Sequence, residues 1–137
     1  MKYIPLIGRI LFSLIFLSSG LMGHLIGLSG TAAYAASQGL PMATFLVALS
    51  GIIAVLGAIS IILGYKAKMG AWLIILFLIP VTFKMHAFWM ITDPAQAMMR
   101  TMQMAMFMKN IALIGAALMI SYFGAGPVSI DASKQAK

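Results

Sequence analysis

The sequence predicts an all-α polytopic membrane protein, a bundle of four transmembrane helices with both termini on the cytoplasmic side. Composition is the first reason: 63% of the 137 residues are hydrophobic and only 8% are charged, with a mean hydropathy of +1.07. A soluble domain carries charge on about a quarter of its residues, so lipid must replace water around much of this chain. The second reason is a set of four long apolar runs, and the third is the placement of lysines between them.

The apolar runs cover about residues 4–26, 43–63, 70–91 and 106–123. Each approaches or exceeds the ~18 residues that indicate a spanning helix. The runs are continuous, whereas the strands of a membrane barrel alternate apolar and polar residues. They predict one four-helix domain over residues 1–126, followed by a polar cytoplasmic tail at 127–137.

Lysine placement predicts the orientation of these helices. One side of the membrane receives Lys2, Lys66, Lys68, Lys134 and Lys137. The other side receives only Arg100, against Asp93, so the lysine-rich side is expected to be cytoplasmic. The net charge of +7 is therefore expected to orient the helices in the membrane and to attract anionic membrane lipids. Nucleic acid is not expected as a partner. A redox partner protein and a second copy of the chain remain possible partners.

The first long connection allows two interpretations. A short interfacial helix through Ala32–Ser37, capped by Ser29 or Thr31 and ended by Gly39, is the expected one. The alternative is a signal peptide cleaved before Ala36, but the preceding apolar run is longer than such peptides usually have.

Small residues at helical spacing predict where the helices pack closely. The predicted faces are Gly23 with Gly27, Ser50 with Ala54 and Ala58, and Ala112 with Ala116. Pro80 is expected to kink the third helix and to free a backbone carbonyl there.

Arg9 lies near the cytoplasmic end of the first helix. Its side chain could extend to the inner lipid headgroups. Alternatively it forms a structural ion pair with Asp131, which would hold the tail against the first helix.

Ionisable residues inside apolar runs are expensive and therefore indicate function. The candidate ligand-binding residues are His86, Lys109, Asn110, His24 and Lys84. Because Lys84 and His86 are two residues apart, a continuous helix would point them about 200° from each other, with His86 inward. The excess of cations would suit a quinone head group, a small sulfur oxyanion or a lipid phosphate. Ordinary interfacial lysines and a hydrogen-bonded histidine are the alternative.

Two further groups of residues lie in the outer half of the chain. The rings of Phe83, Phe88, Trp89 and Phe107 could hold a quinone, or could simply anchor the interface. Met98, Met102 and Met106 share one helical face, which suits Cu(I), although methionine more often fills irregular packing. The chain has no cysteine, which excludes disulfides and thiolate ligands, and no metal site is predicted.

Several short motifs in order resemble the DoxX family of small four-span membrane proteins. They are Gly8-Arg9, Ser19-Gly20, Tyr34, Gly39-Leu40-Pro41, Gly57, Leu63-Gly64, Thr82, His86-Ala87-Phe88, Lys109-Asn110-Ile111-Ala112-Leu113, Gly126-Pro127 and Ser129-Ile130-Asp131. The resemblance covers nearly the whole chain and implies a four-helix membrane fold.

The resemblance also implies an association with quinone-coupled oxidases and thiosulfate oxidation. Arg9, His86, Lys109 and Asn110 match recurrent polar positions of the family. The chain departs from many relatives at Ala54, where a glutamate is common, and at His24, where a lysine is common. Proton or quinone chemistry that needs that glutamate would use another group here.

These observations favour an accessory subunit of a quinone-linked membrane oxidoreductase system, with a quinone or small anion bound near the outer face of the inner membrane. Whether the chain is itself an enzyme stays open. The alternatives are a structural, lipid-binding interaction protein and a small transporter or metal-handling protein.

Overall fold

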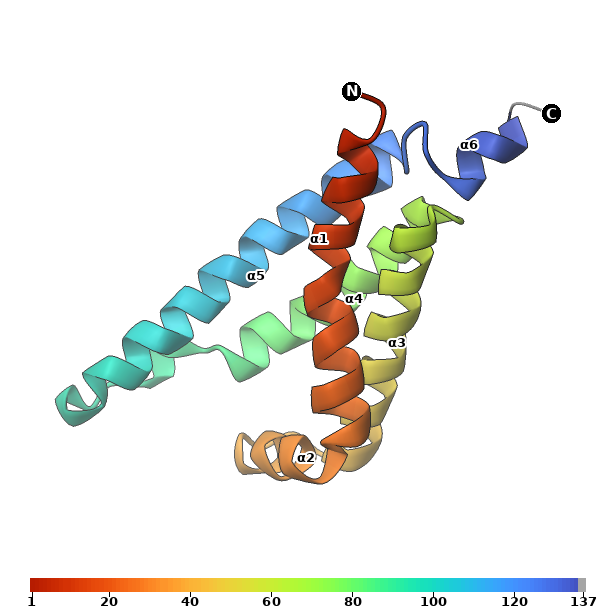
Figure 1. Ribbon diagram of the computed structural model, residues 1–137. Helices are drawn as coiled ribbons and strands as arrows, with labels where there is room; N and C mark the ends of the chain where they lie inside the picture. The colour runs from red at the N-terminus through yellow and green to blue at the C-terminus, as the bar shows by residue number, and fades with distance from the viewer. Residues whose placement is uncertain (136–137) are drawn as a thin grey trace.

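The computed structural model describes residues 1–135, and every regular element in that range is helical (Figure 1). The elements are α1 (Ile4–Ser18), η1 (Ser19–Ile26), α2 (Leu28–Ser37), α3 (Ala43–Leu63), α4 (Ala67–Met85), η2 (Phe88–Met90), η3 (Pro94–Gln96), α5 (Ala97–Phe123) and α6 (Ile130–Gln135). Four segments are long and apolar enough to cross a membrane: Ile4–Ile26, Ala43–Leu63, Ala67–Met90 and Pro94–Phe123. The predicted all-α fold with four spans is confirmed.

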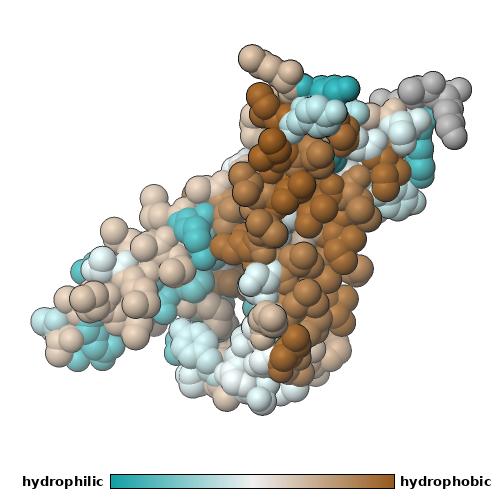
Figure 2. Space-filling view, in the orientation of Figure 1, coloured by the Kyte–Doolittle hydropathy of each residue, from teal (hydrophilic) through white to brown (hydrophobic). Residues whose placement is uncertain are grey.

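The N-terminus and α6 lie at one end of the molecule, together with the turn between α3 and α4 (Figure 1). We call this the terminal end, and the opposite end, which holds α2 and the start of α5, the distal end. A hydrophobic band covers α1 and α3 between hydrophilic groups at the two ends, as Figure 2 shows. This arrangement suits hydrocarbon in the middle and headgroups at both ends.

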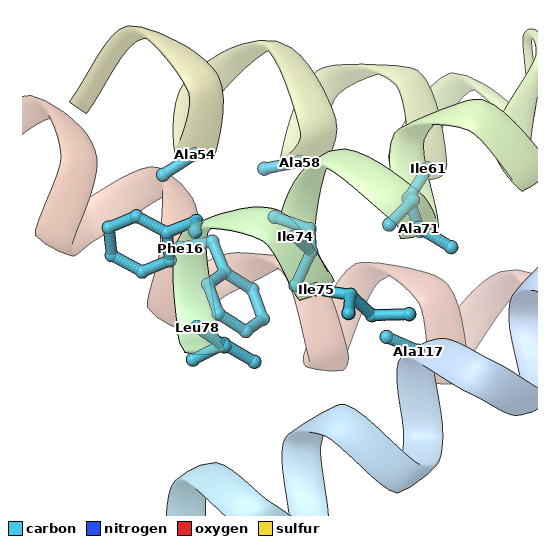
Figure 3. Packing of buried hydrophobic residues seen from close by; sticks show 10 residues of the cluster. Phe16, Ala54, Ala58, Ile61, Ala71, Ile74, Ile75, Leu78 and Ala117 are labelled. Atoms are coloured by element: carbon cyan, nitrogen blue, oxygen red, sulfur yellow. The ribbon is translucent and has the colours of Figure 1, made fainter. Parts of the chain in front are cut away.

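α4 is the central helix, with α3 and α5 packed against it. α1 and η1 pack on α3. Figure 3 shows Ala54 and Ala58 of α3 beside α4, with Ala117 of α5 facing Ile75. The three alanines are 0% exposed, which confirms the predicted face of the second helix at Ala54 and Ala58.

Glycines allow the closest helix crossings. A Cβ at Gly57 would lie 3.0 Å from the Gly70 carbonyl oxygen, and a Cβ at Gly70 would lie 3.0 Å from the Gly57 carbonyl oxygen. Gly20 and Gly51 make the corresponding contact between η1 and α3, where a Cβ on Gly20 would lie 3.1 Å from the Gly51 carbonyl. Close backbone approach of this kind is the main source of helix association in lipid.

Two predicted packing faces are wrong. A Cβ at Gly23 would meet nothing within 4 Å, and one at Gly27 would meet only the backbone of its own turn. Ala112 and Ala116 are exposed, because α5 turns Asn110 and Ala117 toward α4 instead. Small-residue spacing identifies a possible contact face but not which face a neighbour covers.

The first span changes its winding. It is α-helical to Ser18 and continues as a π-helix from Ser19 to Ile26. π-helical turns are rare and occur often at functional sites. Here the wide turn contains Gly20, which presses on α3, and His24, whose side chain reaches the same helix.

The boundaries of the last two spans differ from the predicted ones. α4 begins at Ala67 rather than Gly70, because the Asp131 side chain accepts hydrogen bonds from the Lys66 and Ala67 amides at 2.9 and 3.1 Å. It ends at Met85, so His86 follows the helix instead of continuing it. α5 begins at Ala97 rather than Met106, so the polar residues before Met106 belong to the helix and not to a loop.

The short helix in the first connection is confirmed, although it begins at Leu28 rather than Ala32. Neither predicted residue caps it: the residue before it is Gly27, and the Thr31 hydroxyl donates to the Gly23 carbonyl at 2.6 Å. Gly39 follows the helix with φ of 75°, a conformation that glycine adopts without strain.

Arg9 is buried and holds the tail, but through a different partner from the one predicted. Its guanidinium donates to the Val128 carbonyl, while the Asp131 carboxylate caps α4. The Asp131 amide in turn donates to the Gly64 carbonyl at 2.8 Å. The expected Arg9–Asp131 ion pair is thus replaced by contacts of each residue with backbone groups. Lys137, placed with the cytoplasmic lysines from sequence, lies outside the described residues.

Candidate functional site

The distal end brings together three polar side chains from separate elements. His86 follows α4, and its Nδ1 lies 2.7 Å from Oε1 of Gln103 on α5. The Gln103 Nε2 donates to the hydroxyl of Tyr34 on α2 at 3.4 Å. We call these residues the distal polar chain. It fixes a half-buried imidazole between α2, α4 and α5.

The hydrogen bond to Gln103 indicates the tautomer of neutral His86. Because Oε1 of Gln103 can only accept, Nδ1 of His86 carries a proton. In the neutral ring Nε2 is then an acceptor, and it has no hydrogen-bond partner within residues 1–135. The site can therefore accept a hydrogen bond from a ligand hydroxyl, or donate one to a carbonyl once the ring is protonated.

An aromatic cluster adjoins this chain and is formed by Phe83, Phe88, Trp89 and Phe107. Phe107 is its centre, with ring centroids 5.5 to 5.6 Å from those of the other three rings. All of these contacts are edge-to-face, the arrangement that aromatic pairs prefer. The cluster ties η2 to α5 and supplies an apolar wall on the residues that follow His86.

His24 forms a second polar contact, separate from the distal polar chain. Its Nδ1 lies 2.8 Å from the Ser50 hydroxyl, which itself donates to the Val47 carbonyl at 2.8 Å. Because the hydroxyl proton is used on Val47, His24 is the donor to Ser50. The ring also packs edge-on against Phe77 with centroids 5.5 Å apart. Within residues 1–135 no hydrogen bond joins His24 to His86; His24 links η1 to α3.

The remaining candidate residues are dispersed. The Lys84 ammonium lies 3.8 Å from the position of a Cβ on Gly39, which places the cation at the C-terminal end of α2, where a positive charge is favourable. Lys109 contacts the Met106 sulfur at 3.4 Å on the exposed side of α5. Asn110 is buried, 4% exposed, and faces α4. The five residues predicted as one ligand site thus occupy different environments.

Tyr34 and Gln103 were not predicted as members of the site, nor Ser50 as the partner of His24. Tyr34 appeared only among the family motifs, and Gln103 is the one amide between neighbouring methionines. For Ser50, a polar residue inside an apolar run was the available signal. Tyr34 and Gln103 lie between the predicted runs, where polar residues are ordinary.

A metal site receives little support from the geometry. Within the described range no three histidine, aspartate or glutamate side chains are grouped closely enough to hold an ion. Met98, Met102 and Met106 lie along α5 and are 79%, 52% and 37% exposed, while Nδ1 of His86 is bonded to Gln103. These methionines face outward from the bundle.

The fold and the distal polar chain define a multi-pass membrane protein whose polar side chains meet where α2, α4 and α5 come together. The chain belongs to the DoxX family, whose sequence model matches residues 4–87. It is similar to the inner membrane protein YphA of Escherichia coli K12, with 32% identity over 126 residues that cover 92% of this chain and 86% of that protein. No solved structure matches the chain. With the four apolar helices, this likeness places the chain in the inner membrane.

Proposed function

We propose that the chain is an accessory subunit of a quinone-linked membrane oxidoreductase system and that it binds a quinone-type head group at His86. The observation that carries the proposal is the distal polar chain, in which Gln103 and Tyr34 orient the imidazole. An imidazole that is half-buried and oriented by a hydrogen-bond partner is suited to bind one further polar group through its second ring nitrogen. Nε2 of His86 is the member without a partner within residues 1–135.

The chemistry of a quinone head group suits this arrangement. A quinol hydroxyl would donate to Nε2 of neutral His86, and protonated His86 would donate to a quinone carbonyl. The aromatic cluster would offer an apolar wall for the ring of the ligand. Lys84 and Lys109 are exposed and lie outside the distal polar chain, so they would contribute only long-range attraction for an anionic ligand.

Copurification tests this function. The wild type, isolated in mild detergent from membranes that contain quinone, is extracted with organic solvent and analysed by mass spectrometry. We expect bound quinone in the wild type and at least about a tenfold loss in His86→Ala, because the hydrogen bond from the ligand to an oriented imidazole is removed. Gln103→Leu should show a smaller loss, since the imidazole stays but is no longer oriented.

Lys68→Gln is the matched control, because it changes one polar residue at the opposite end of the molecule. It should retain quinone at the wild-type level. Absence of quinone from the wild type, or retention in His86→Ala, would contradict the proposal. Phospholipid as the sole extracted molecule would favour the structural, lipid-binding alternative.

We further propose that the terminal end faces the cytoplasm, as the lysine distribution indicates. Because the chain has no cysteine, single cysteines report their side without background. In intact cells a membrane-impermeant maleimide should label Ser37→Cys at the distal end and leave Ser133→Cys unlabelled. Both side chains are exposed, so permeabilised cells should label both variants. The reverse pattern in intact cells would invert the orientation.

A further inference from the structure

The terminal end contains a cationic hollow of about 770 Å³. Lys66 of the α3–α4 turn, Lys68 of the first turn of α4 and Lys134 of α6 line it. An apolar groove of about 380 Å³ lies beside it, between α1 and α5. The hollow and the groove share Phe123, Gly124 and Ala125 in their walls, so they are adjacent regions of one surface.

The hollow is lined by three lysines against one acid, Asp131. The ammonium groups of Lys134 and Lys66 lie 4.4 and 5.8 Å from the centre of the same Tyr65 ring. Asp131 is the acid in the lining, and its oxygens accept from the backbone amides of Lys66 and Ala67. Within residues 1–135, no ammonium group of the hollow forms a salt bridge with it. An anionic ligand would relieve this repulsion.

The groove has the character of an acyl-chain site. Phe12 of α1 and Ile120 of α5 line it, and Gly8 leaves open space, because a Cβ there would meet nothing within 4 Å. From Pro5 to Phe12 it follows about 10 Å of helix, at 1.5 Å per residue. Its apolar walls suit a hydrocarbon chain and not a water-soluble ligand.

Arg9 supplies a second, independent feature of a binding site. It lines the groove and is only 3% exposed. Its Nη2 donates to Val128, whereas Nε and Nη1 have no hydrogen-bond partner within the described part of the chain. Unpartnered buried donors of a cation are expensive. Nη1 lies against Gly64 and neither atom is accessible in this structure, so a phosphate or ester oxygen would reach them only by displacing that packing.

We propose that this surface binds an anionic diacyl phospholipid, with the phosphate in the cationic hollow and an acyl chain in the groove between α1 and α5. A soluble phosphate would use the hollow alone and leave the groove empty. A zwitterionic lipid would fill the groove but gain less from the three lysines. The proposal concerns the end of the molecule opposite to His86 and does not depend on quinone binding.

The headgroup part is tested on the full-length protein in detergent by native mass spectrometry, with phosphatidylglycerol and phosphatidylcholine as probes. The wild type should retain phosphatidylglycerol at least about tenfold more strongly, as expected for several lysines near an anionic headgroup. Lys68→Gln/Lys134→Gln should bring the two lipids within about twofold. The control Lys2→Gln/Arg100→Gln removes the same charge outside the hollow and should keep the preference. Equal retention of both lipids by the wild type, or an unchanged preference in the hollow variant, overturns the proposal.

The groove part is tested with Gly8→Leu, which adds a side chain to the groove at a position where a Cβ meets nothing within 4 Å. Gly115→Leu is its matched control, because a Cβ there also meets nothing within 4 Å but Gly115 is not in the groove lining. Gly8→Leu should lower phosphatidylglycerol retention about tenfold, and Gly115→Leu should not change it. Glycerol phosphate without acyl chains should not bind at the same concentration. Binding of glycerol phosphate as strong as that of the lipid, or full retention by Gly8→Leu, overturns the acyl-chain assignment.

Discussion

Gly57→Leu should destabilise the protein by at least about 3 kcal/mol, at or above the upper end of the usual cost of overpacking. Even a Cβ at Gly57 would lie 2.9 Å from Cδ1 of Ile74 and 3.0 Å from the Gly70 carbonyl. The carbonyl belongs to helix backbone, so α3 and α4 must separate to make room. That separation would open the core around Ala58 and Ile74, which are 0% exposed. Unfolding in detergent, followed by circular dichroism during SDS titration, measures the loss.

Gly115→Leu controls for the added side chain and for helix propensity. A Cβ at Gly115 would meet nothing within 4 Å, so its leucine should extend into lipid or detergent. We expect its stability to be within about 0.5 kcal/mol of the wild type, as for most exposed substitutions. Equal stability of Gly57→Leu and Gly115→Leu would show that α3 and α4 do not cross at these glycines.

Asp131→Ala should cost about 2 kcal/mol, the upper range for loss of a helix N-cap. The Asp131 carboxylate accepts from the amides of Lys66 and Ala67, which open α4. Its negative charge also interacts favourably with the positive N-terminal end of that helix. The cap comes from the tail, so its loss should also release α6. Hydrogen exchange should accelerate at the amides of residues 66, 67 and 131, while the distal half of α4 stays protected.

Asp93→Ala is the matched control, because the Asp93 side chain caps a helical turn in the same way, accepting from the Ala95 amide at 2.9 Å. That turn, η3, has three residues and is exposed, so its loss should cost about 0.5 kcal/mol. If Asp131→Ala were no more destabilising than Asp93→Ala, the tail would not be holding α4. Asp131→Asn should keep part of the stability, since the amide oxygen still accepts.

The number of spans and their approximate centres could be predicted from the sequence, because hydropathy is a property of contiguous residues. The sequence also predicted the buried face at Ala54 and Ala58. The helix ends were less predictable. α4 begins early because of a carboxylate 65 positions away from Lys66, and α5 begins early although residues 97–105 include Arg100 and other polar side chains.

The candidate site was likewise predictable only in part. His86 was predicted as a ligand-binding residue of the outer half and lies at the distal end, but its expected inward direction assumed a continuous helix. The structure ends α4 at Met85, so the orientation of His86 comes from Gln103, 17 positions away. Its next neighbour in the chain of hydrogen bonds, Tyr34, lies a further 69 positions from Gln103. No local pattern encodes such partners.

By itself the sequence determined that this protein spans a membrane as helices, since runs this apolar can satisfy their backbone in lipid in no other way. Tertiary structure alone decided that Arg9 holds the tail at Val128. It also decided that Gly57 and Gly70, not Gly23 and Gly27, form a helix crossing. The physical reason is that partners for a buried donor or a close backbone contact depend on which helix faces which, and that is set by packing among residues far apart in the chain.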